Sequence, residues 1–213
     1  MVDHELLAVL AEAQAIGFLG KPALDDHVDN GLGFAAAIRA VGGARVVDLG
    51  SGGGVPALVV ARALHEVAIT CVDRGTRRCE FLDDAVHTLG LADRVVVVEG
   101  DAEEVARSVG HAATYDVVTA RSFGPPAVTA EAASRFLVTD GTLLVSEPPT
   151  AEAGVRWHAP TELATLGLSY EGLFDAEDVQ IAMVKRTAVE VGERYPRRAA
   201  TVRKRPLFSS AGA

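Results

Sequence analysis

Glycines and an aspartate that follow an apolar run, over residues 46–54, are the first candidates for chemistry in this chain. The letters VVDL lead into GSGGG, and Pro56 and the apolar stretch 57–61 come next. This order predicts a strand, a tight turn and a helix, because glycine adopts positive φ readily and proline suits the first helical turn. Free N–H groups at such a turn and at a helix N-terminus bind negative groups. The stretch therefore predicts a site for a nucleotide-like ligand with a negative group.

The glycine spacing separates this turn from the dinucleotide-binding pattern G-x-G-x-x-G, which needs a third glycine where Val55 stands. Instead, D-x-G-x-G-x-G runs from Asp48 to Gly54 and resembles motif I of class I S-adenosylmethionine (SAM) methyltransferases. A plain tight turn before a helix is the alternative. The SAM interpretation assigns to the cofactor site Asp48, Gly50, Ser51, Gly52, Gly54 and Val55.

A second acidic residue, Asp73, ends the next apolar run and lies 19 residues after Gly54. In nucleotide-binding folds, a carboxylate about 20 residues after the glycine turn accepts the ribose hydroxyls. A solvated loop aspartate is the alternative. The glycine turn and Asp73 together predict a nucleoside-type cofactor.

Alternating strands and helices must position these residues. Strands are predicted at 45–49, 67–72, 95–98, 115–120 and 142–145, with helices at 56–65, 77–89, 103–109 and 127–136. This alternation predicts a parallel α/β sheet, and the fully apolar run 95–98 is typical of a strand covered on both faces. Before this alternating region, helices are predicted at 3–17 and 25–41. After it, an antiparallel pair of strands is predicted at 166–174 and 179–185.

The predicted fold is thus α/β, a Rossmann-like class I SAM-methyltransferase fold. Its seven-stranded sheet is mostly parallel, with an antiparallel C-terminal strand and helices on both faces. The predicted domains are an N-terminal helical extension (1–43), a SAM-binding domain (44–190) and a basic C-terminal tail (191–213).

The ends of the third and fourth predicted strands contribute further candidates, because ligands of such sheets bind at the carboxyl ends of strands. Asp101, Ala102 and Glu103 are expected to hold the adenine, although Asp101 and Glu104 also match a helix capping box. Arg121 is a positively charged residue in an otherwise acidic site. We expect it to position cofactor or substrate, with simple pairing to a carboxylate as the alternative.

Two absences at the fourth strand end narrow the chemistry. No cysteine stands there to attack a pyrimidine carbon, and no [DN]-P-P-[YF] motif of exocyclic-amine methylases is found. A substrate atom with its own lone pair, such as guanine N7, needs neither device. Transfer to it would be an in-line displacement driven by proximity and alignment.

The composition indicates one aliphatic domain, with 49% hydrophobic residues among 213 and a net charge of −9. Neither a membrane-span pattern nor a signal pattern is found, so we expect a cytoplasmic protein. Cys71 and Cys79 are expected to be packing residues, and no metal site is predicted. We expect the basic segment 194–205 to contact a polyanion, with a solvated tail as the alternative. Its basic residues are Arg194, Arg197, Arg198, Arg203, Lys204 and Arg205.

Over residues 27–207 the chain resembles the bacterial small-subunit ribosomal RNA guanine-N7 methyltransferases, also called the glucose-inhibited division protein B family. The resemblance rests on VVDLGSGGGVPALVVA (46–61), GDAEEV (100–105), YDVVTARSF (115–123) and ERYPRRAATVRKRPL (193–207). It implies that SAM is held by Gly50, Val55, Ala102, Glu103 and Arg121. It also implies that the basic tail meets ribosomal RNA or the small subunit, and that guanine N7 is methylated. We expect a monomer.

Departures from the family pattern leave the RNA substrate open. The family's H-F-x-D-S-L stretch stands here as HVDNGL, residues 27–32, and no N-terminal Asn-Leu-Thr element is found. A diverged member of actinobacterial type would look like this. His27, Trp157 and His158 could touch substrate, although isolated residues of these types more often pack.

Two other functions stay open: a small-molecule SAM-dependent methyltransferase, and a SAM- and RNA-binding module without catalysis. The salt dependence of activity distinguishes the small-molecule enzyme from an RNA enzyme. The logarithm of the affinity for single-stranded RNA falls with the logarithm of the salt concentration, with a slope of about −0.7 per neutralised phosphate.

Overall fold

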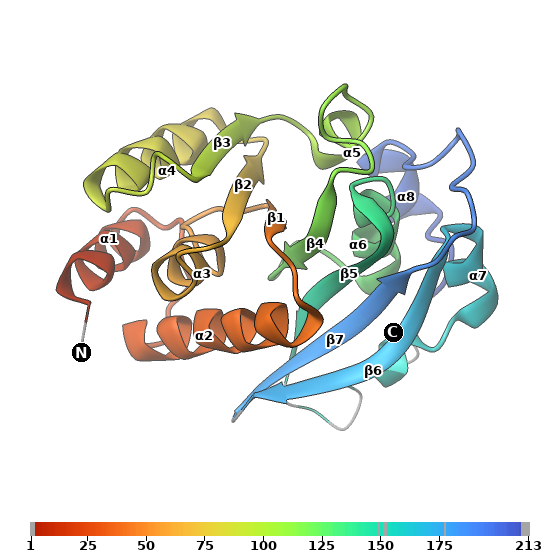
Figure 1. Ribbon diagram of the computed structural model, residues 1–213, viewed down its shortest axis with the longest axis horizontal. Helices are drawn as coiled ribbons and strands as arrows, with labels where there is room; N and C mark the ends of the chain where they lie inside the picture. Colours follow the sequence, from red (N-terminus) through yellow and green to blue (C-terminus); the bar gives the residue numbers. More distant parts are fainter. Residues whose placement is uncertain (1–2, 149, 151–152, 177, 210–213) are drawn as a thin grey trace.

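Seven strands form one sheet in the computed structural model, which describes residues 3–148, 150, 153–176 and 178–209. Their order is β3-β2-β1-β4-β5-β7-β6 (Figure 1). Every neighbouring pair is parallel except the two that involve β7, which runs antiparallel to β5 and β6. This confirms the predicted fold class. The strands are β1 (Arg45–Leu49), β2 (Ala68–Asp73), β3 (Val95–Glu99), β4 (Tyr115–Ala120), β5 (Leu137–Glu147), β6 (Leu168–Ala176) and β7 (Val179–Arg186).

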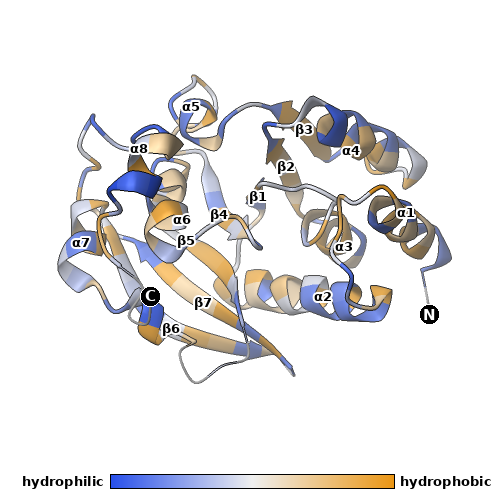
Figure 2. Cartoon of the chain, turned by 180° about the vertical axis from the view of Figure 1, so that it is seen from behind, coloured by the Kyte–Doolittle hydropathy of each residue, from blue (hydrophilic) through white to orange (hydrophobic). Residues whose placement is uncertain are grey.

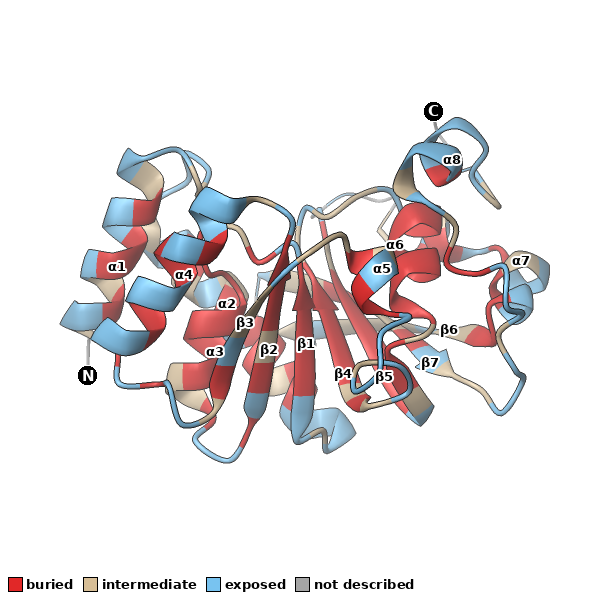
Figure 3. Cartoon of the chain, turned by 90° about the horizontal axis from the view of Figure 1, so that it is seen from above, coloured by how far each residue is buried: buried red, intermediate tan, exposed pale blue. Residues whose placement is uncertain are grey.

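Helices cover both faces of the sheet (Figure 3). The sheet separates the core into two apolar clusters, one on each face. One face carries α1 (His4–Ala15), α2 (Leu24–Val41), α3 (Ala57–Ala63) and α4 (Thr76–Thr88). The other carries α5 (Ala102–Val105), α6 (Pro126–Ala133), the 3-10 helix η1 (Val155–Trp157), α7 (Pro160–Thr165) and α8 (Ala199–Lys204). The central strand serves both clusters, because successive side chains point to opposite faces: Val46 belongs to the first and Val47 to the second.

The third strand departs from its prediction. The apolar run 95–98 suggested burial on both faces, but β3 lies at the edge of the sheet and pairs only with β2. Val95 packs in the first cluster, whereas Val96 is 58% exposed. An all-valine run cannot reveal that one of its faces lacks a covering helix.

Three other elements differ from the sequence prediction. The predicted turn at 140–141 is an irregularity inside the longer strand β5, where Asp140 has φ 66°. Helix α7 follows Pro160, with its own Leu163 buried, and was not predicted. Part of the basic tail folds as α8.

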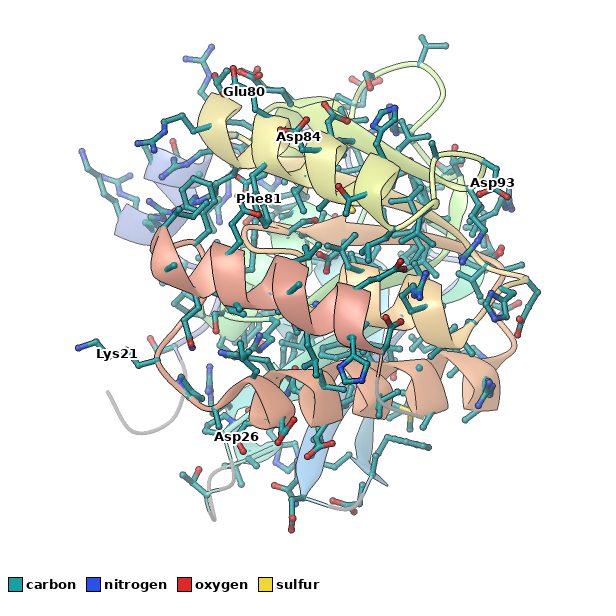
Figure 4. All side chains as sticks on the ribbon, turned by 90° about the vertical axis from the view of Figure 1, so that its left-hand side faces the viewer. Lys21, Asp26, Glu80, Phe81, Asp84 and Asp93 are labelled. Carbon is teal, nitrogen blue, oxygen red and sulfur yellow. The ribbon has the colours of Figure 1, made fainter. Side chains whose placement is uncertain are left out.

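The N-terminal helices pack on the sheet beside α3 and α4. Figure 4 shows Phe81 pointing from α4 toward α1, while Glu80 and Asp84 lie on the outer side of α4. Phe81 meets the ring of Phe18 edge-on, with the centroids 5.8 Å apart. Between α2 and α3, a Cβ added at Gly31 would overlap Val59. The domain boundary drawn at residue 43 stays a prediction. No helix within the described ranges is both long and apolar enough to cross a membrane.

Candidate cofactor and RNA site

The glycine turn lies between β1 and α3 and needs glycine for steric reasons. Gly50, Gly52 and Gly54 have φ of 68°, 54° and 91°, a region that side chains with a Cβ rarely adopt. At Gly54 an added Cβ would also overlap Leu58. The N–H of Gly52 donates to Oδ2 of Asp73 over 3.0 Å. The turn is therefore tied to the end of β2.

Asp73 is buried at the end of β2, only 4% exposed. Its Oδ1 accepts the N–H of Gly75 over 2.9 Å and lies 3.6 Å from the Arg78 guanidinium. Each carboxylate oxygen has two lone pairs, so each retains the capacity to accept another donor. The side chain is thus fixed in orientation and still able to bind a ligand.

A cavity of about 550 Å³ opens at the carboxyl ends of β1, β2 and β4. This edge is where the strand order reverses around β1 and β4, the usual ligand position in such sheets. Asp48 and Gly54 do not line the cavity. The other predicted cofactor residues do, namely Gly50, Ser51, Gly52, Val55, Asp73, Asp101, Ala102, Glu103 and Arg121.

Asp48 lies beneath the turn, 1% exposed, in the middle of the sheet. Thr119 donates its hydroxyl to Oδ1 over 2.7 Å, and Oδ2 has no hydrogen-bond partner among the described residues. Burial raises the pKa of Asp48 to about 6, although the Thr119 hydrogen bond and the Arg121 charge oppose that rise. Asp48 therefore contributes a buried negative charge behind the cavity wall.

Arg121 is held by His27, which the sequence suggested as a substrate contact or a packing residue but not as the partner of Arg121. The Arg121 guanidinium donates to Nδ1 of His27 over 2.7 Å, and the other ring nitrogen, Nε2, lies 3.1 Å from the carbonyl of Gly20. Burial, aided by the Arg121 charge, lowers the pKa of His27. A neutral ring that accepts at Nδ1 and donates from Nε2 fits this arrangement. The signal was present in the HVDNGL stretch, which opens with this histidine.

Aromatic residues form part of the cavity wall and were also missed. Phe18 lines the cavity from the loop after α1, and the Arg77 and Arg78 guanidinium carbons lie 5.9 Å from its ring centroid. Phe123 lies so close to Gly50 that an added Cβ would stand 3.0 Å from its ring. Both residues come from loops, where no periodic pattern marks them.

The basic tail returns to the cofactor cavity. Ala199 and Arg203 of α8 line it together with the glycine turn. Oε1 of Glu103 accepts the N–H of Ala199 over 2.7 Å, so a residue predicted to hold adenine also anchors this helix. Figure 2 shows α8 beside α6, and the strongly hydrophilic residues of this helix, Arg203 and Lys204, lie in its last turn. Of the six basic residues predicted to contact RNA, five are exposed, namely Arg194, Arg198, Arg203, Lys204 and Arg205.

Arg197 has a different role from the one predicted. Its backbone N–H and Nε donate to Oε1 of Glu131 over 2.7 and 2.8 Å, and its terminal nitrogen donates to Oε2 over 2.7 Å. The Glu131 side chain is fully buried. This bidentate pair fixes the tail to α6, so the guanidinium of Arg197 is occupied inside the protein rather than directed at RNA.

Two smaller predictions have separate outcomes. Asp101 stands at the N-cap of α5, as the capping-box alternative expected, but its side chain makes no capping hydrogen bond. Cys71 and Cys79 are buried, as expected of packing residues. Within the part of the chain that the structure describes, no group of three or more His, Cys, Asp or Glu side chains could hold a metal ion.

Comparison with known structures supports the fold. An O-methyltransferase from Bacillus cereus, solved in complex with S-adenosylhomocysteine (SAH), aligns with a TM-score of 0.63 over 88% of this chain and 92% of its own, at 13% identity. A putative O-methyltransferase from Klebsiella pneumoniae gives the same TM-score and coverage at 17% identity.

Comparison of sequences identifies the family. The family model for rRNA small subunit methyltransferase G matches residues 23–159. The ribosomal RNA small subunit methyltransferase G of Leuconostoc citreum is 33% identical over 166 residues, which cover 76% of this chain and 69% of that protein. The protein of that name from Mycobacterium sp. strain JLS is 36% identical over 134 residues, 62% of this chain and 56% of its own. The chain therefore belongs to the rRNA small subunit methyltransferase G family.

Proposed function

We propose that this chain is a SAM-dependent methyltransferase that acts on guanine N7 of small-subunit ribosomal RNA. One observation carries the proposal beyond family membership: α8 lines the cofactor cavity while it carries exposed cations of the basic tail. That arrangement would bring RNA phosphates to the rim of the cavity that holds the methyl donor.

The cavity fits SAM by its donor and acceptor groups. The glycine turn lets the amino-acid part of the cofactor approach the main chain closely, and the free lone pairs of Asp73 suit the ribose hydroxyls. The buried charge of Asp48, with its unpartnered Oδ2, favours the positive groups of the cofactor from behind the wall. Ala102 and Glu103, at the end of β3, would border the adenine. SAM, when bound, supplies a methyl group on a positively charged sulfur.

Arg121 is the proposed positioning residue. Its guanidinium has five N–H donors, and the hydrogen bond to His27 directs the group while leaving other donors free. Guanine presents two adjacent acceptors, N7 and O6, along one edge. A donor from Arg121 to O6 would align N7 for in-line attack, and no general base is needed because N7 carries its own lone pair.

The wider setting follows from the same chemistry. The exposed cations of the tail suit the phosphate backbone, and their interaction with it weakens as salt rises. Transfer to a ring nitrogen requires no metal. We place the enzyme in the cytoplasm, as a monomer with the small ribosomal subunit or its RNA as partner.

The test supplies methyl-labelled SAM to small subunits and to naked ribosomal RNA from cells that lack this gene. Mass mapping then locates the label. We expect it on guanine N7. An Arg198→Ala, Arg205→Ala double variant should methylate more slowly, with a shallower dependence on salt. An Asp25→Ala, Asp29→Ala double variant, which changes exposed acids of α2, is the matched control and should behave as wild type.

Outcomes without label separate the alternatives. SAM binding with no transfer to either RNA would contradict the proposal, and a metabolite screen would then test the small-molecule reaction. If salt-sensitive RNA binding persists without turnover on any substrate, the chain is a non-catalytic module.

A further inference from the structure

A second cavity, of about 400 Å³, adjoins the cofactor cavity at the carboxyl ends of β4 and β5. Arg121 and Ser122 line both cavities. Ser122 has φ 56°, an uncommon conformation for a residue with a Cβ, and such strain gathers at functional sites. The second cavity is within the size range of small-ligand pockets. It therefore lies where the acceptor of the methyl group must approach.

The second cavity is also lined by a buried carboxylate, Glu147, at the end of β5. Its side chain is only 1% exposed. Oε1 accepts the indole N–H of Trp157 over 2.9 Å. Oε2 has no hydrogen-bond partner among the described residues, and the nearest guanidinium, of Arg156, lies 3.6 Å away, which is an ion-pair distance rather than a hydrogen bond. Buried polar oxygens are rarely left unpaired, so this atom invites a donor from a ligand.

A second unpaired acceptor lies in the same wall. The Nδ2 group of Asn30 donates to the Ser146 hydroxyl over 3.1 Å, while its Oδ1 is buried without a partner among the described residues. Both unsatisfied atoms of this cavity are acceptors. A ligand that presents several hydrogen-bond donors, such as N–H groups, would therefore fit this cavity.

Among RNA bases, guanine meets this requirement best. Its Watson–Crick edge carries N1–H and the 2-amino group side by side, two adjacent donors that a carboxylate accepts together. Adenine, cytosine and uracil each carry only one donor group on this edge, so none of them presents two adjacent donors. Enzymes that act on an unstacked base commonly identify it by hydrogen bonds to this edge.

We propose that Glu147 is a specificity-determining residue that binds N1–H and the 2-amino group of the target guanine in this second cavity. The inference rests on the proposed function, in that the substrate is a guanine in RNA. Asn30 Oδ1 adds a second acceptor, and Trp157 forms part of the wall against the base. Arg121 would then bind O6, and Glu147 the neighbouring N1–H and 2-amino group of the same purine.

Glu147 also favours the transfer itself. As the N7 lone pair forms the new bond to the methyl carbon, the bond from that carbon to sulfur breaks, and the positive charge passes to the purine ring. No proton changes place. A carboxylate on N1–H and the 2-amino group binds the cationic ring more tightly than the neutral one, so it stabilises the transition state more than the ground state.

Trp157 provides the assay, because it is the only tryptophan in the chain and it lies against Glu147. The protein is saturated with SAH, so that added nucleotides cannot occupy the cofactor cavity. Guanosine monophosphate (GMP) is then titrated while tryptophan emission is recorded. Inosine monophosphate (IMP), which lacks the 2-amino group, and adenosine monophosphate are titrated in parallel. We expect saturable binding of GMP, binding of IMP weaker by about tenfold or more, and none of the adenine nucleotide.

The variant Glu147→Gln tests the assigned residue. Glutamine keeps an acceptor for the Trp157 indole but loses the charge and one acceptor, so GMP affinity should fall about tenfold or more. The preference for GMP over IMP should largely disappear. SAH affinity should match wild type, because Glu147 does not line the cofactor cavity. Glu171→Gln, the same change at an exposed site on β6, is the control and should alter none of these values.

Three results would overturn the inference: equal affinity of wild type for GMP and IMP, no response to GMP, or a Glu147→Gln variant that keeps the full preference. A merely structural Glu147 would lower stability without changing the ratio of GMP to IMP affinity. If the variant does not fold, the wild-type ratio still decides whether the cavity recognises the 2-amino group.

Failure of this inference and failure of the proposed function give different results. Glu147-dependent preference for GMP without methylation of any RNA would leave the cavity assignment standing and contradict the proposed reaction. Label on guanine N7 with an unchanged preference in Glu147→Gln would do the reverse.

Discussion

Replacement of Arg197 by methionine should break the contact that fixes the basic tail to α6, and should lower the stability of the protein rather than only weaken RNA binding. The change removes the two side-chain hydrogen bonds to Glu131 and leaves that carboxylate fully buried without its cation. The backbone N–H of residue 197 remains as a single donor. Removal of one partner of a buried ion pair lowers the free energy of unfolding by about 3–5 kcal/mol. The Arg197 side chain is 23% exposed, so screening by water is limited.

The measurement is urea unfolding followed by the emission of Trp157, together with SAH affinity. Arg198→Met is the matched control: this neighbouring side chain is exposed, and its loss should change stability by less than about 0.5 kcal/mol. Adding Glu131→Gln to Arg197→Met should recover part of the loss, because the unpaired buried charge is then gone. A loss below about 1 kcal/mol in Arg197→Met, or no recovery in the double variant, would refute the assignment of this pair as a structural anchor.

Of three further predictions, two concern the cofactor site and one the packing of α2 on α3. Burial raises the pKa of Asp48 from 3.8 to about 6. The folded state therefore binds this proton more tightly than the unfolded state does, and the resulting gain in unfolding free energy is complete below pH 3.8 and is lost as pH rises through 6. The difference of 2.2 pKa units corresponds to about 3 kcal/mol. Asp48→Asn should therefore abolish a decline in unfolding free energy between pH 4 and 6 in urea titrations, and an identical decline in the variant would contradict this. Asp73→Ala should weaken SAM binding by about 1–3 kcal/mol in calorimetry, whereas Asp84→Ala, on the outer side of α4, should not; unchanged affinity would exclude the ribose role. Gly31→Ala should lower stability by about 1–3 kcal/mol in thermal unfolding, because the added Cβ overlaps a side chain of α3; a stability equal to wild type would show that α2 shifts freely.

The parts of the fold that could be predicted are those encoded over short distances in the chain. A glycine turn is visible because positive φ selects glycine, and Asp73 is visible because strand and helix lengths fix its spacing from the turn. The length of β5 was missed because the Asp140 and Gly141 pair, a common turn signal, is absorbed as an irregularity inside the strand.

The parts of the site that escaped prediction depend on residues far apart in sequence. Arg121 and His27 are 94 positions apart, and Arg197 and Glu131 are 66 apart. A basic tail shows its charge in the sequence but not which of its cations is occupied by a buried carboxylate. The partner of each side chain is decided by how the helices pack, which periodicity alone does not encode.

The position of α8 has a consequence for the order of events in turnover. One short helix forms a wall of the cofactor cavity and carries the cations that suit RNA. Any movement of α8 that RNA causes must change the affinity for the cofactor, and thermodynamic reciprocity then requires the cofactor to change the affinity for RNA by the same factor. Substrate capture and the exchange of spent cofactor would therefore be linked equilibria, to be measured as one coupling constant rather than as two separate affinities.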